Sequence, residues 1–258
     1  MKPEAHCRIV VLAGDGLSTR IVVNALRKRF GEVTVLIEEG ESTSTFLRRR
    51  LRKLGWLQTA GQVAFMLYAR VGMWRARRRR SVLLEAFDTQ GIPGTQIRKL
   101  QSVNSAQARG LLRKLAPTVV VVNGTRIISA KTLASVRAPF INMHAGITPG
   151  FRGAHGGYWA LATGAVRDCG VTVHRVDAGV DTGAVLAQAR ISPARSDNFF
   201  TYPLLQLGAG LPLLLDAVAD ACAGMLREVP TSGTSASAQW YHPALWTYVR
   251  IGLHRGVW

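Results

Sequence analysis

Residues 8–40 predict a strand, a helix and a second strand joined by short turns. "RIVVLAGDG" is an apolar run that ends in glycines, and "EVTVLIEEG" is a second apolar run. Between them, "STRIVVNALRKRFG" fits a helix capped by Ser18 or Thr19, with Gly31 just past its end. Two strands joined by a crossover helix lie parallel in one sheet. The chain is therefore expected to be an α/β protein with a mainly parallel sheet.

Later segments extend this pattern. "TVVVVNG", "APFINMH" and the two halves of "CGVTVHRVDAGVDTGAVLAQARI" predict strands, while "QARGLLRKLAP", "GGYWALATG" and "LLQLGAGLPLLLDAVADACAGML" predict helices. We place a Rossmann-like α/β domain at 1–190. Residues 191–258 are expected to form a small C-terminal extension, a helix and an aromatic tail that pack on the core. A membrane span needs about 18 apolar residues in a row, and the sequence has no uninterrupted run of that length.

The cysteines give no sign of pairing. Cys7, Cys169 and Cys222 are far apart and odd in number, and no CxxC pair occurs. Metal-ligand spacings of the HxH, HExxH or Cys/His kind are also missing from the sequence. We therefore expect free thiols, no metal site and a reducing, cytoplasmic location.

The formal net charge of +18 belongs largely to one segment. Eleven basic residues stand between Arg48 and Arg80, and no acidic residue occurs between Ser42 and Leu84; elsewhere 22 basic residues face 15 acidic ones. The segment predicts a basic helical insertion at about 43–84. A basic, tryptophan-containing amphipathic helix suits an anionic membrane surface, here through residues 46–80, at the inner face of the membrane. A solvated arginine face or a homodimer contact remain alternatives, and without a recognition motif we expect no nucleic-acid partner.

The glycine turn Gly14-Asp15-Gly16 allows two interpretations. Glu38 or Glu39 stands about where a dinucleotide-binding protein has its ribose-binding acid, but Thr19 occupies the position of the third glycine. A helix N-terminus with free N–H groups suits a phosphate or another anion equally well. We favour the anion over the dinucleotide.

Asn142 and His144 stand two positions apart at the end of a predicted strand. Residues i and i+2 of a strand point to the same side, so both side chains should face one space. Asp181, in "GVDTG", could reach them from a neighbouring turn. An aspartate orients a histidine and favours its charged form, and an asparagine amide can donate to an oxygen that becomes anionic. Acyl transfer to an amine fits this set, although satisfaction of local backbone groups is the simpler alternative.

"INMHAGITPGFRG" followed by "GVTVHRVDAGVDTGAVLAQ" resembles the 10-formyltetrahydrofolate-dependent formyltransferase family, over about residues 119–188. Its members include nucleotide-sugar N-formyltransferases, glycinamide ribonucleotide formyltransferase and the catalytic domain of methionyl-tRNA formyltransferase. The resemblance implies 10-formyltetrahydrofolate as cosubstrate. It also implies that Asn142 and His144 polarise the formyl oxygen, while Asp181 pairs with His144 and helps a water move protons.

The resemblance implies binding residues as well. The folate pocket would include Asn123, Gly124, Ile127, Ile128, Gly179 and Val180. The acceptor would meet Gly14, Gly16, Arg152 and Gly153. One departure is Gly146-Ile147-Thr148-Pro149, where the family often has Ser-Leu-Leu-Pro, so the folate contacts of that loop should differ.

The acceptor is expected to be an amine on a nucleotide- or lipid-linked amino sugar. Trp159 resembles a residue of the sugar enzymes. A histidine at position 157 would favour the ribonucleotide enzyme, but this chain has Gly157 there. We expect too little chain after residue 190 for the second domain of the methionyl-tRNA enzymes. A formyltetrahydrofolate hydrolase and a ribonucleotide formyltransferase remain alternatives. A basic peripheral membrane or nucleic-acid-binding protein with an idle site is an alternative of another class.

Overall fold

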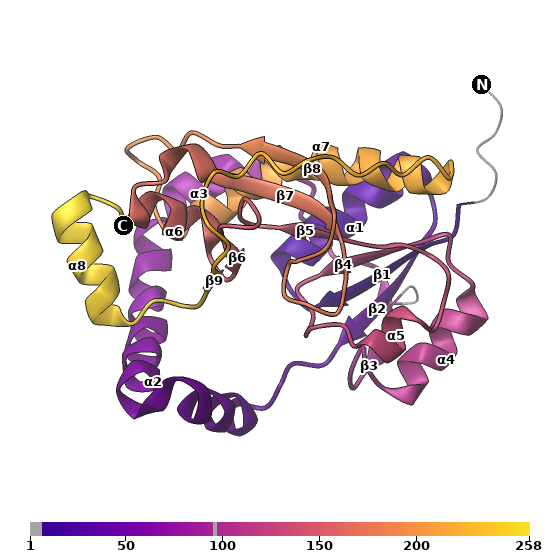
Figure 1. The fold of residues 1–258 in the computed structure, drawn as a ribbon, viewed down its shortest axis with the longest axis horizontal. Coiled ribbons are helices and arrows are strands. Elements are labelled where there is room, and N and C mark those ends of the chain that lie inside the picture. The colour runs from indigo at the N-terminus through magenta and orange to yellow at the C-terminus, as the bar shows by residue number, and fades with distance from the viewer. Residues whose placement is uncertain (1–6, 95–96) are drawn as a thin grey trace.

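A seven-stranded sheet forms the centre of the structure, a computed structural model (Figure 1). The model describes residues 7–94 and 97–258, apart from the side chains of residues 43 and 46; residues 1–6 and 95–96 of the expected 1–190 domain lie outside the described residues. In spatial order the strands are β3 (Ile97–Leu100), β2 (Val33–Glu38), β1 (Ile9–Gly14), β4 (Val119–Asn123), β5 (Phe140–His144), β7 (Gly170–Arg175) and β8 (Val185–Arg190).

The sheet is mainly parallel, which confirms the predicted fold class. The five strands from β3 to β5 run parallel, β7 pairs antiparallel with β5, and β8 pairs antiparallel with β7. Apolar residues on both faces of β1, β2 and β4 are buried, as expected of parallel strands with helices on each side.

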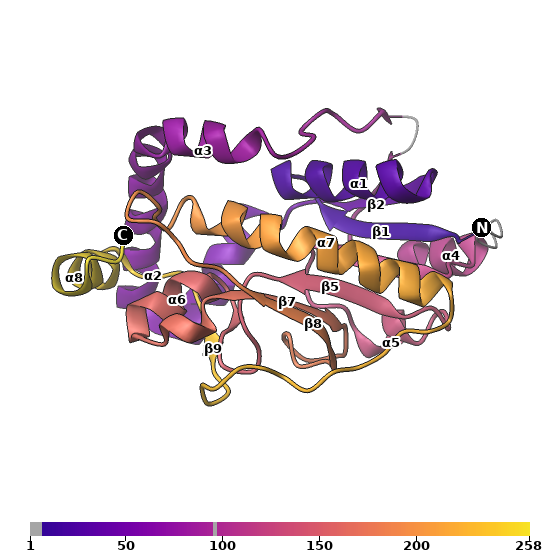
Figure 2. The ribbon, with the colours of Figure 1, turned by 90° about the horizontal axis from the view of Figure 1, so that it is seen from above.

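Helices cover both faces of this sheet (Figure 2). The helices of the described chain are α1 (Leu17–Phe30), α2 (Thr43–Arg75), α3 (Arg77–Leu84), α4 (Ala106–Leu115), α5 (Ala130–Leu133), α6 (Gly156–Thr163), α7 (Tyr202–Cys222) and α8 (Leu245–Arg255). Helices α1 and α7 pack on one face of the sheet and α4 on the other. Val11 and Val35 point towards α1 and α7, whereas Val10 and Leu36 point towards α4. A second, two-stranded sheet pairs β6 (Arg152–Gly153) with β9 (Gln239–Trp240).

Helix α1 begins two or three residues earlier than predicted. Its N-cap is Gly16, without a side-chain cap, so the predicted Ser18 or Thr19 cap is wrong. The Thr19 hydroxyl instead donates to the carbonyl oxygen of Gly14, 2.7 Å away, and braces the turn between β1 and α1. Gly31 ends the helix at a positive φ of 84°, as predicted.

Helix α7 is long and apolar enough to cross a membrane, by its length and hydropathy alone. It packs along β5, β7 and β8 and against α1, and residues such as Leu214 and Val218 are fully buried there. This packing accounts for its apolar character as a core helix. Our division of the chain at residue 190 stays a prediction.

The basic segment forms α2 and α3, in agreement with the predicted helical insertion. Helix α2 changes direction at Gly55, whose φ of 76° is non-helical, and stands with α8 at one end of the molecule (Figures 1 and 2). The helices meet around an aromatic cluster made of Phe65, Tyr158, Phe199, Phe200, Tyr202 and Tyr248. The predicted aromatic tail therefore contains a helix that the sequence analysis missed.

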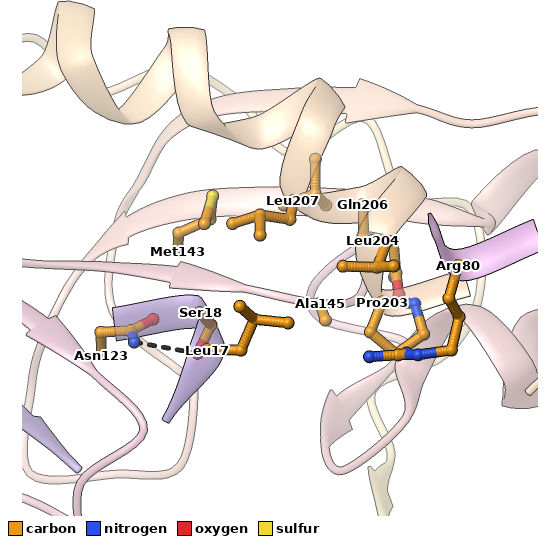
Figure 3. A pocket seen from close by; sticks show the side chains of 11 residues that line it. Leu17, Ser18, Arg80, Asn123, Met143, Ala145, Pro203, Leu204, Gln206 and Leu207 are labelled. Carbon is orange, nitrogen blue, oxygen red and sulfur yellow. Dashed lines mark hydrogen bonds between the residues drawn. The ribbon is translucent and has the colours of Figure 1, made fainter. Parts of the chain in front are cut away.

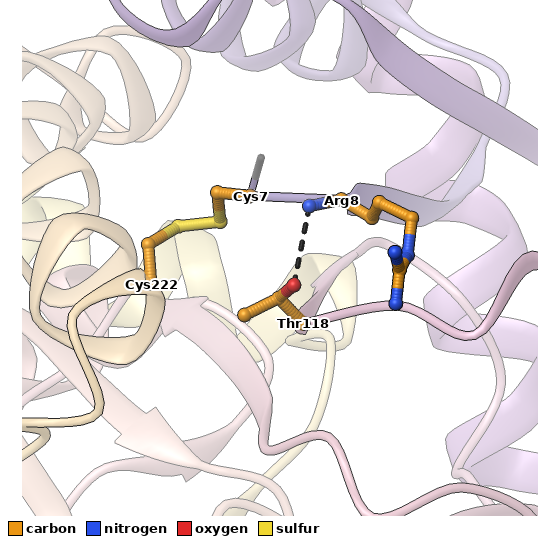
Figure 4. The surroundings of a disulfide bond; sticks show 4 residues. All are labelled: Cys7, Arg8, Thr118 and Cys222. Atoms are coloured by element: carbon orange, nitrogen blue, oxygen red, sulfur yellow. Dashed lines mark hydrogen bonds between the residues drawn. A yellow bond between two sulfur atoms is a disulfide. The ribbon is translucent and has the colours of Figure 1, made fainter. Parts of the chain in front are cut away.

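A disulfide joins Cys7 to Cys222, with their Cα atoms 5.4 Å apart (Figure 4). It ties the residue before β1 to the end of α7. The expectation of three free thiols is therefore wrong, and Cys169, which is buried, is the free one. The two cysteines are 215 residues apart, so no local spacing in the sequence could predict that they pair.

Candidate active site

The carboxyl ends of β1, β4 and β5 meet at one edge of the sheet. Strand order turns back on itself beside β1, since β2 and β3 lie on one side of it and β4 and β5 on the other. Open α/β sheets bind ligands at such a point, outside the carboxyl ends of the strands. The predicted site residues that follow β1, β4 and β5 or stand at their carboxyl ends all lie along this edge.

Asn142 and His144 face one side of β5, as their spacing predicted. Both line a cavity of about 330 Å³ at the end of the sheet. Asn142 pairs with His174 across the antiparallel β5–β7 ladder. The two predicted groups thus share one space, and β7 adds a third polar side chain to it.

Asp181 completes the predicted set from the loop between β7 and β8. Its Oδ2 lies 3.3 Å from Nδ1 of His144, and its Oδ1 lies 3.5 Å from Nδ2 of Asn142. The backbone N–H of Gly153 donates to Oδ2 at 2.8 Å. Asp181 has a positive φ of 50°, a conformation that aspartate tolerates better than most residues. The structure therefore brings Asn142, His144 and Asp181 together.

His174 is a member of this cluster that the sequence analysis missed. Its Nε2 lies 3.2 Å from Nδ2 of Asn142 and 3.5 Å from Oδ1 of Asp181. Its Nδ1 lies 2.7 Å from the carbonyl oxygen of Arg175, which can only accept, so Nδ1 carries a proton. The available signal was its place on the alternating strand "GVTVH", directly before the Asp181 loop.

The cluster holds Asp181 ionised. Burial alone would raise the pKa of this carboxyl group, but the neighbouring imidazoles of His174 and His144 and the hydrogen bond from the Gly153 N–H outweigh it and lower the pKa to about 2. The aspartate is therefore a fixed negative charge at neutral pH.

His144 is buried, and each of its ring nitrogens faces an oxygen atom. Burial lowers the pKa of His144, although Asp181 and the carbonyl group of Phe151 oppose this shift. Nε2 donates to the Phe151 carbonyl oxygen at 2.7 Å, which leaves Nδ1 of the neutral ring as the basic nitrogen, facing Asp181. A proton that arrives at Nδ1 would thus be stabilised directly by a carboxylate.

Two loops wall the 330 Å³ cavity. Five of the six predicted folate-pocket residues line it, namely Gly124, Ile127, Ile128, Gly179 and Val180. Asn123 does not: its amide donates to the hydroxyl oxygens of Ser18 and Thr19, at 3.2 and 2.9 Å, and it lines a different cavity. The placement of Asn123 in the folate pocket stays a prediction that its side-chain position does not support.

That other cavity, of about 320 Å³, lies on the opposite side of β5 (Figure 3). Met143 and Ala145, which alternate with the two polar residues of β5, reach it together with side chains from the start of α1 and of α7. Arg80 of the basic insertion also lines it.

The four predicted acceptor-binding residues do not gather in one place. Gly14 lines a third cavity, of about 840 Å³, which shares residues 124–127 with the 330 Å³ cavity; Gly16 is the N-cap of α1. Arg152 donates to the carbonyl oxygen of Val180 at 3.1 Å, and Gly153 donates to Asp181. Arg152 and Gly153 therefore hold the Asp181 loop in place, and their assignment as direct acceptor contacts stays a prediction.

The residues present fit the folate cosubstrate that the resemblance implies. The 330 Å³ cavity has apolar side chains, Ile127 and Ile128, on one wall. Its other wall has the polar side chains of Asn142, His144, His174 and Asp181, here called the Asn142 cluster. Its volume is typical of a small-molecule site. An apolar wall for a flat heterocycle next to a polar cluster for its reactive group is the arrangement that such a ligand needs.

Comparison with known proteins agrees with the fold. The family model described as "Formyl transferase" matches residues 62–199, more than half of the chain. The chain therefore belongs to the formyl transferase family, as its motifs indicated.

Two bacterial methionyl-tRNA formyltransferases illustrate the sequence relationship. The enzyme of Koribacter versatilis is 35% identical over 142 residues, 54% of this chain and 44% of that protein. The enzyme of a Synechococcus species is 34% identical over 158 residues, 60% of this chain and 47% of that protein. The chain thus spans about half the length of the curated relatives it matches.

Solved structures share the fold at lower identity. A sugar N-formyltransferase from Shewanella has a TM-score of 0.56 at 14% identity, covering 90% of this chain and 76% of that one. The phosphoribosylglycinamide formyltransferase of Streptococcus pneumoniae has a TM-score of 0.54 at 20% identity, covering 83% and 98%. These likenesses support the fold and do not choose an acceptor.

Proposed function

We propose that this protein transfers a formyl group from 10-formyltetrahydrofolate to a primary amine. The observation that carries the proposal is the meeting of Asn142, His144 and Asp181 on one wall of the 330 Å³ cavity. Membership of the formyl transferase family supports the same reaction.

Each residue has a task in this reaction. The folate supplies a formyl carbon bound to a nitrogen that can leave. Asn142 donates from Nδ2 to the formyl oxygen, which gains negative charge as the amine adds to the carbon. Its present contacts, 3.2 Å to His174 and 3.5 Å to Asp181, are long, so a substrate oxygen can compete for the amide protons.

His144 and Asp181 handle the proton. The attacking amine must lose a proton, and the folate nitrogen must gain one. His144 is neutral because burial lowers its pKa, so Nδ1 can take the proton through a water. The charge of Asp181, 3.3 Å away, stabilises the protonated ring until the proton passes to the departing nitrogen.

We further propose that the acceptor amine belongs to a nucleotide- or lipid-linked amino sugar and enters through the 840 Å³ cavity. This cavity adjoins the folate cavity at residues 124–127. Arg49, Arg50 and Lys53 of α2 line it and could bind phosphates, while Asp15 and Glu39 could attract an amine. The proposed place of action is the cytoplasm; a homodimer is not required by this arrangement.

The test is release of tetrahydrofolate from 10-formyltetrahydrofolate in the presence of separate acceptors. The panel contains nucleotide-linked amino sugars, a lipid-linked amino sugar, glycinamide ribonucleotide, methionyl-tRNA and water alone. Release that requires an amino sugar supports the proposal. Equal release with water alone would mean a hydrolase, and release only with glycinamide ribonucleotide or methionyl-tRNA would contradict the proposed acceptor.

A further inference from the structure

Helix α2 has an apolar stripe on the side that faces solvent. The stripe consists of Trp56, Val63, Leu67, Val71 and Trp74, spaced three, four or seven residues apart and therefore on one helical face. Trp56, Leu67 and Trp74 are 74%, 61% and 62% exposed. Met66 and Met73 flank the stripe and are exposed as well. Its length is roughly 27 Å by the helical rise per residue.

The opposite face of α2 is already used for packing. Phe65 and Ala76 are buried in the aromatic cluster, Gly72 lies against the ring of Phe200, and Gly61 lies against Trp246 of α8. The helix is therefore fixed to the protein along one side and apolar on the other. An exposed apolar surface of this size usually marks an interaction site.

Basic residues stand at both ends of the stripe. Five lie at its start, between Arg48 and Lys53, and five at its end, between Arg75 and Arg80, with no acidic residue between Ser42 and Leu84. Some of these charges are engaged, as in the ion pair of Arg79 with Asp197 at 2.8 Å. Arg52, Arg75 and Arg78 are exposed. The stripe is thus an apolar strip framed by positive charge, with one further exposed basic residue, Arg70, on the same face.

This charge pattern selects the partner. Two copies of the chain joined through the stripe, parallel or antiparallel, would place basic ends beside basic ends, which is unfavourable. A nucleic acid would match the charges but would offer its phosphates to tryptophan, leucine and valine. An anionic bilayer matches both, because its headgroups attract the arginines while its acyl region takes the apolar side chains.

We propose that α2 docks the protein on an anionic membrane surface through the stripe. The part of α2 after Gly55 lies in the plane of the interface, because its other face is packed on the protein and cannot enter lipid. Arg49 and Lys53 at the start of α2 also line the 840 Å³ cavity, so docking holds a wall of that cavity at the bilayer. On the proposed formyl transfer, on which this consequence rests, docking favours an acceptor carried by a lipid.

The test is co-sedimentation with vesicles of phosphatidylcholine alone or with one third phosphatidylglycerol. We expect binding to the anionic vesicles only, weakening as salt is added. The variant Trp56→Gln, Leu67→Gln, Trp74→Gln should bind at least about tenfold more weakly, through lost apolar burial. The variant Arg52→Gln, Arg75→Gln, Arg78→Gln should also lose about tenfold or more, through lost attraction.

Matched controls separate docking from folding and from catalysis. Val166→Gln with Met225→Gln removes side chains that are 61% and 57% exposed outside α2, and this variant should bind like the wild type. His144→Ala should also bind normally, so docking is measured independently of formyl transfer. If the triple apolar variant fails to fold by circular dichroism, Trp56→Gln alone serves in its place.

Three results would overturn the proposal. One is no binding to the anionic vesicles, and another is equal binding by the wild type and the apolar variant, which would mean charge attraction alone. The third is a stable dimer in analytical ultracentrifugation that the apolar substitutions dissociate, which would assign the stripe to a second copy.

Discussion

Asp181 is the residue on which the other groups of the site converge. His144, His174, Asn142 and the backbone N–H of Gly153 all lie within 3.5 Å of its carboxylate oxygens. A buried carboxylate with this many partners resists protonation, and its removal leaves the two imidazoles without their common neighbour. Its charge therefore affects both stability and reaction.

The contribution of Asp181 to stability should depend on pH. Its pKa of about 2 in the folded protein lies below the ordinary 3.8, so the ionised form favours folding. The sign of the shift means that about 2 kcal/mol is present above the ordinary pKa and is lost as the pH falls towards 2. Urea unfolding of the wild type and Asp181→Asn should show a constant difference above about pH 5 that shrinks in acid. A difference that does not change with pH would contradict the assigned shift.

Strand parity was enough to predict that Asn142 and His144 share a space, because side chains alternate along any strand. It could not reveal His174, since the pairing of β7 with β5 is a tertiary fact that brings residues 32 positions apart into contact. The side-chain contacts of Asn123 could not be predicted for a similar reason. Its side chain turns towards α1, where two hydroxyl groups accept its amide protons.

At the scale of elements, α2 depends on glycines at the points where other side chains of the protein pack against it. A Cβ atom on Gly72 would collide with the ring of Phe200, whereas a Cβ atom on Gly110 of α4 would meet nothing within 4 Å. Both glycines lie inside helices. The structure therefore gives Gly72 a packing role.

The two glycines make a matched pair of substitutions. Gly72→Ala should lower the free energy of unfolding by about 1–3 kcal/mol, because the added methyl group forces α2 away from Phe200. Gly110→Ala should raise it by roughly 0.5–1 kcal/mol through better helix propensity. Thermal and chemical unfolding measure both; shifts of the same sign and size in the two variants would argue against the close contact.

Elements with a strong period were predicted well, and those held by tertiary contacts were missed. The apolar runs of β1, β2, β4 and β5 and the helices α4 and α6 lie where the pattern placed them. Strand β3, "IRKL", has two charged residues out of four and forms by pairing with β2 at the edge of the sheet. Helix α8 was missed because its sequence was taken only as an aromatic tail; it packs on α2.

At the scale of the whole molecule, the disulfide links the segment before β1 to the end of helix α7. Cys7 precedes the central strand β1 and Cys222 ends α7, so the bond closes almost the entire fold into one loop (Figure 4). A link between such distant residues restricts the unfolded chain strongly. A reducing compartment would favour the free thiols over this disulfide. The redox state of the bond in the cell would therefore indicate the compartment in which the protein acts.

Loss of the disulfide should cost stability. Reduction, or the pair Cys7→Ala and Cys222→Ala, should lower the free energy of unfolding by about 2–5 kcal/mol. Unfolding with and without dithiothreitol measures the effect, and the double variant should not respond to the reductant. A wild type whose unfolding ignores dithiothreitol, with three titratable thiols, would contradict the bond.

The central claim is that the Asn142 cluster catalyses formyl transfer to an amine, and the rate of tetrahydrofolate release tests it most directly. Measured with the acceptor that supports turnover, kcat/KM of Asn142→Ala should fall about 10²- to 10³-fold, the usual cost of losing a donor to a developing oxyanion. Gln107→Ala, on the exposed surface of α4, should leave it unchanged. If Asn142→Ala, folded as the wild type by circular dichroism, keeps its rate within about tenfold, Asn142 does not stabilise the transition state and the account of the site is wrong.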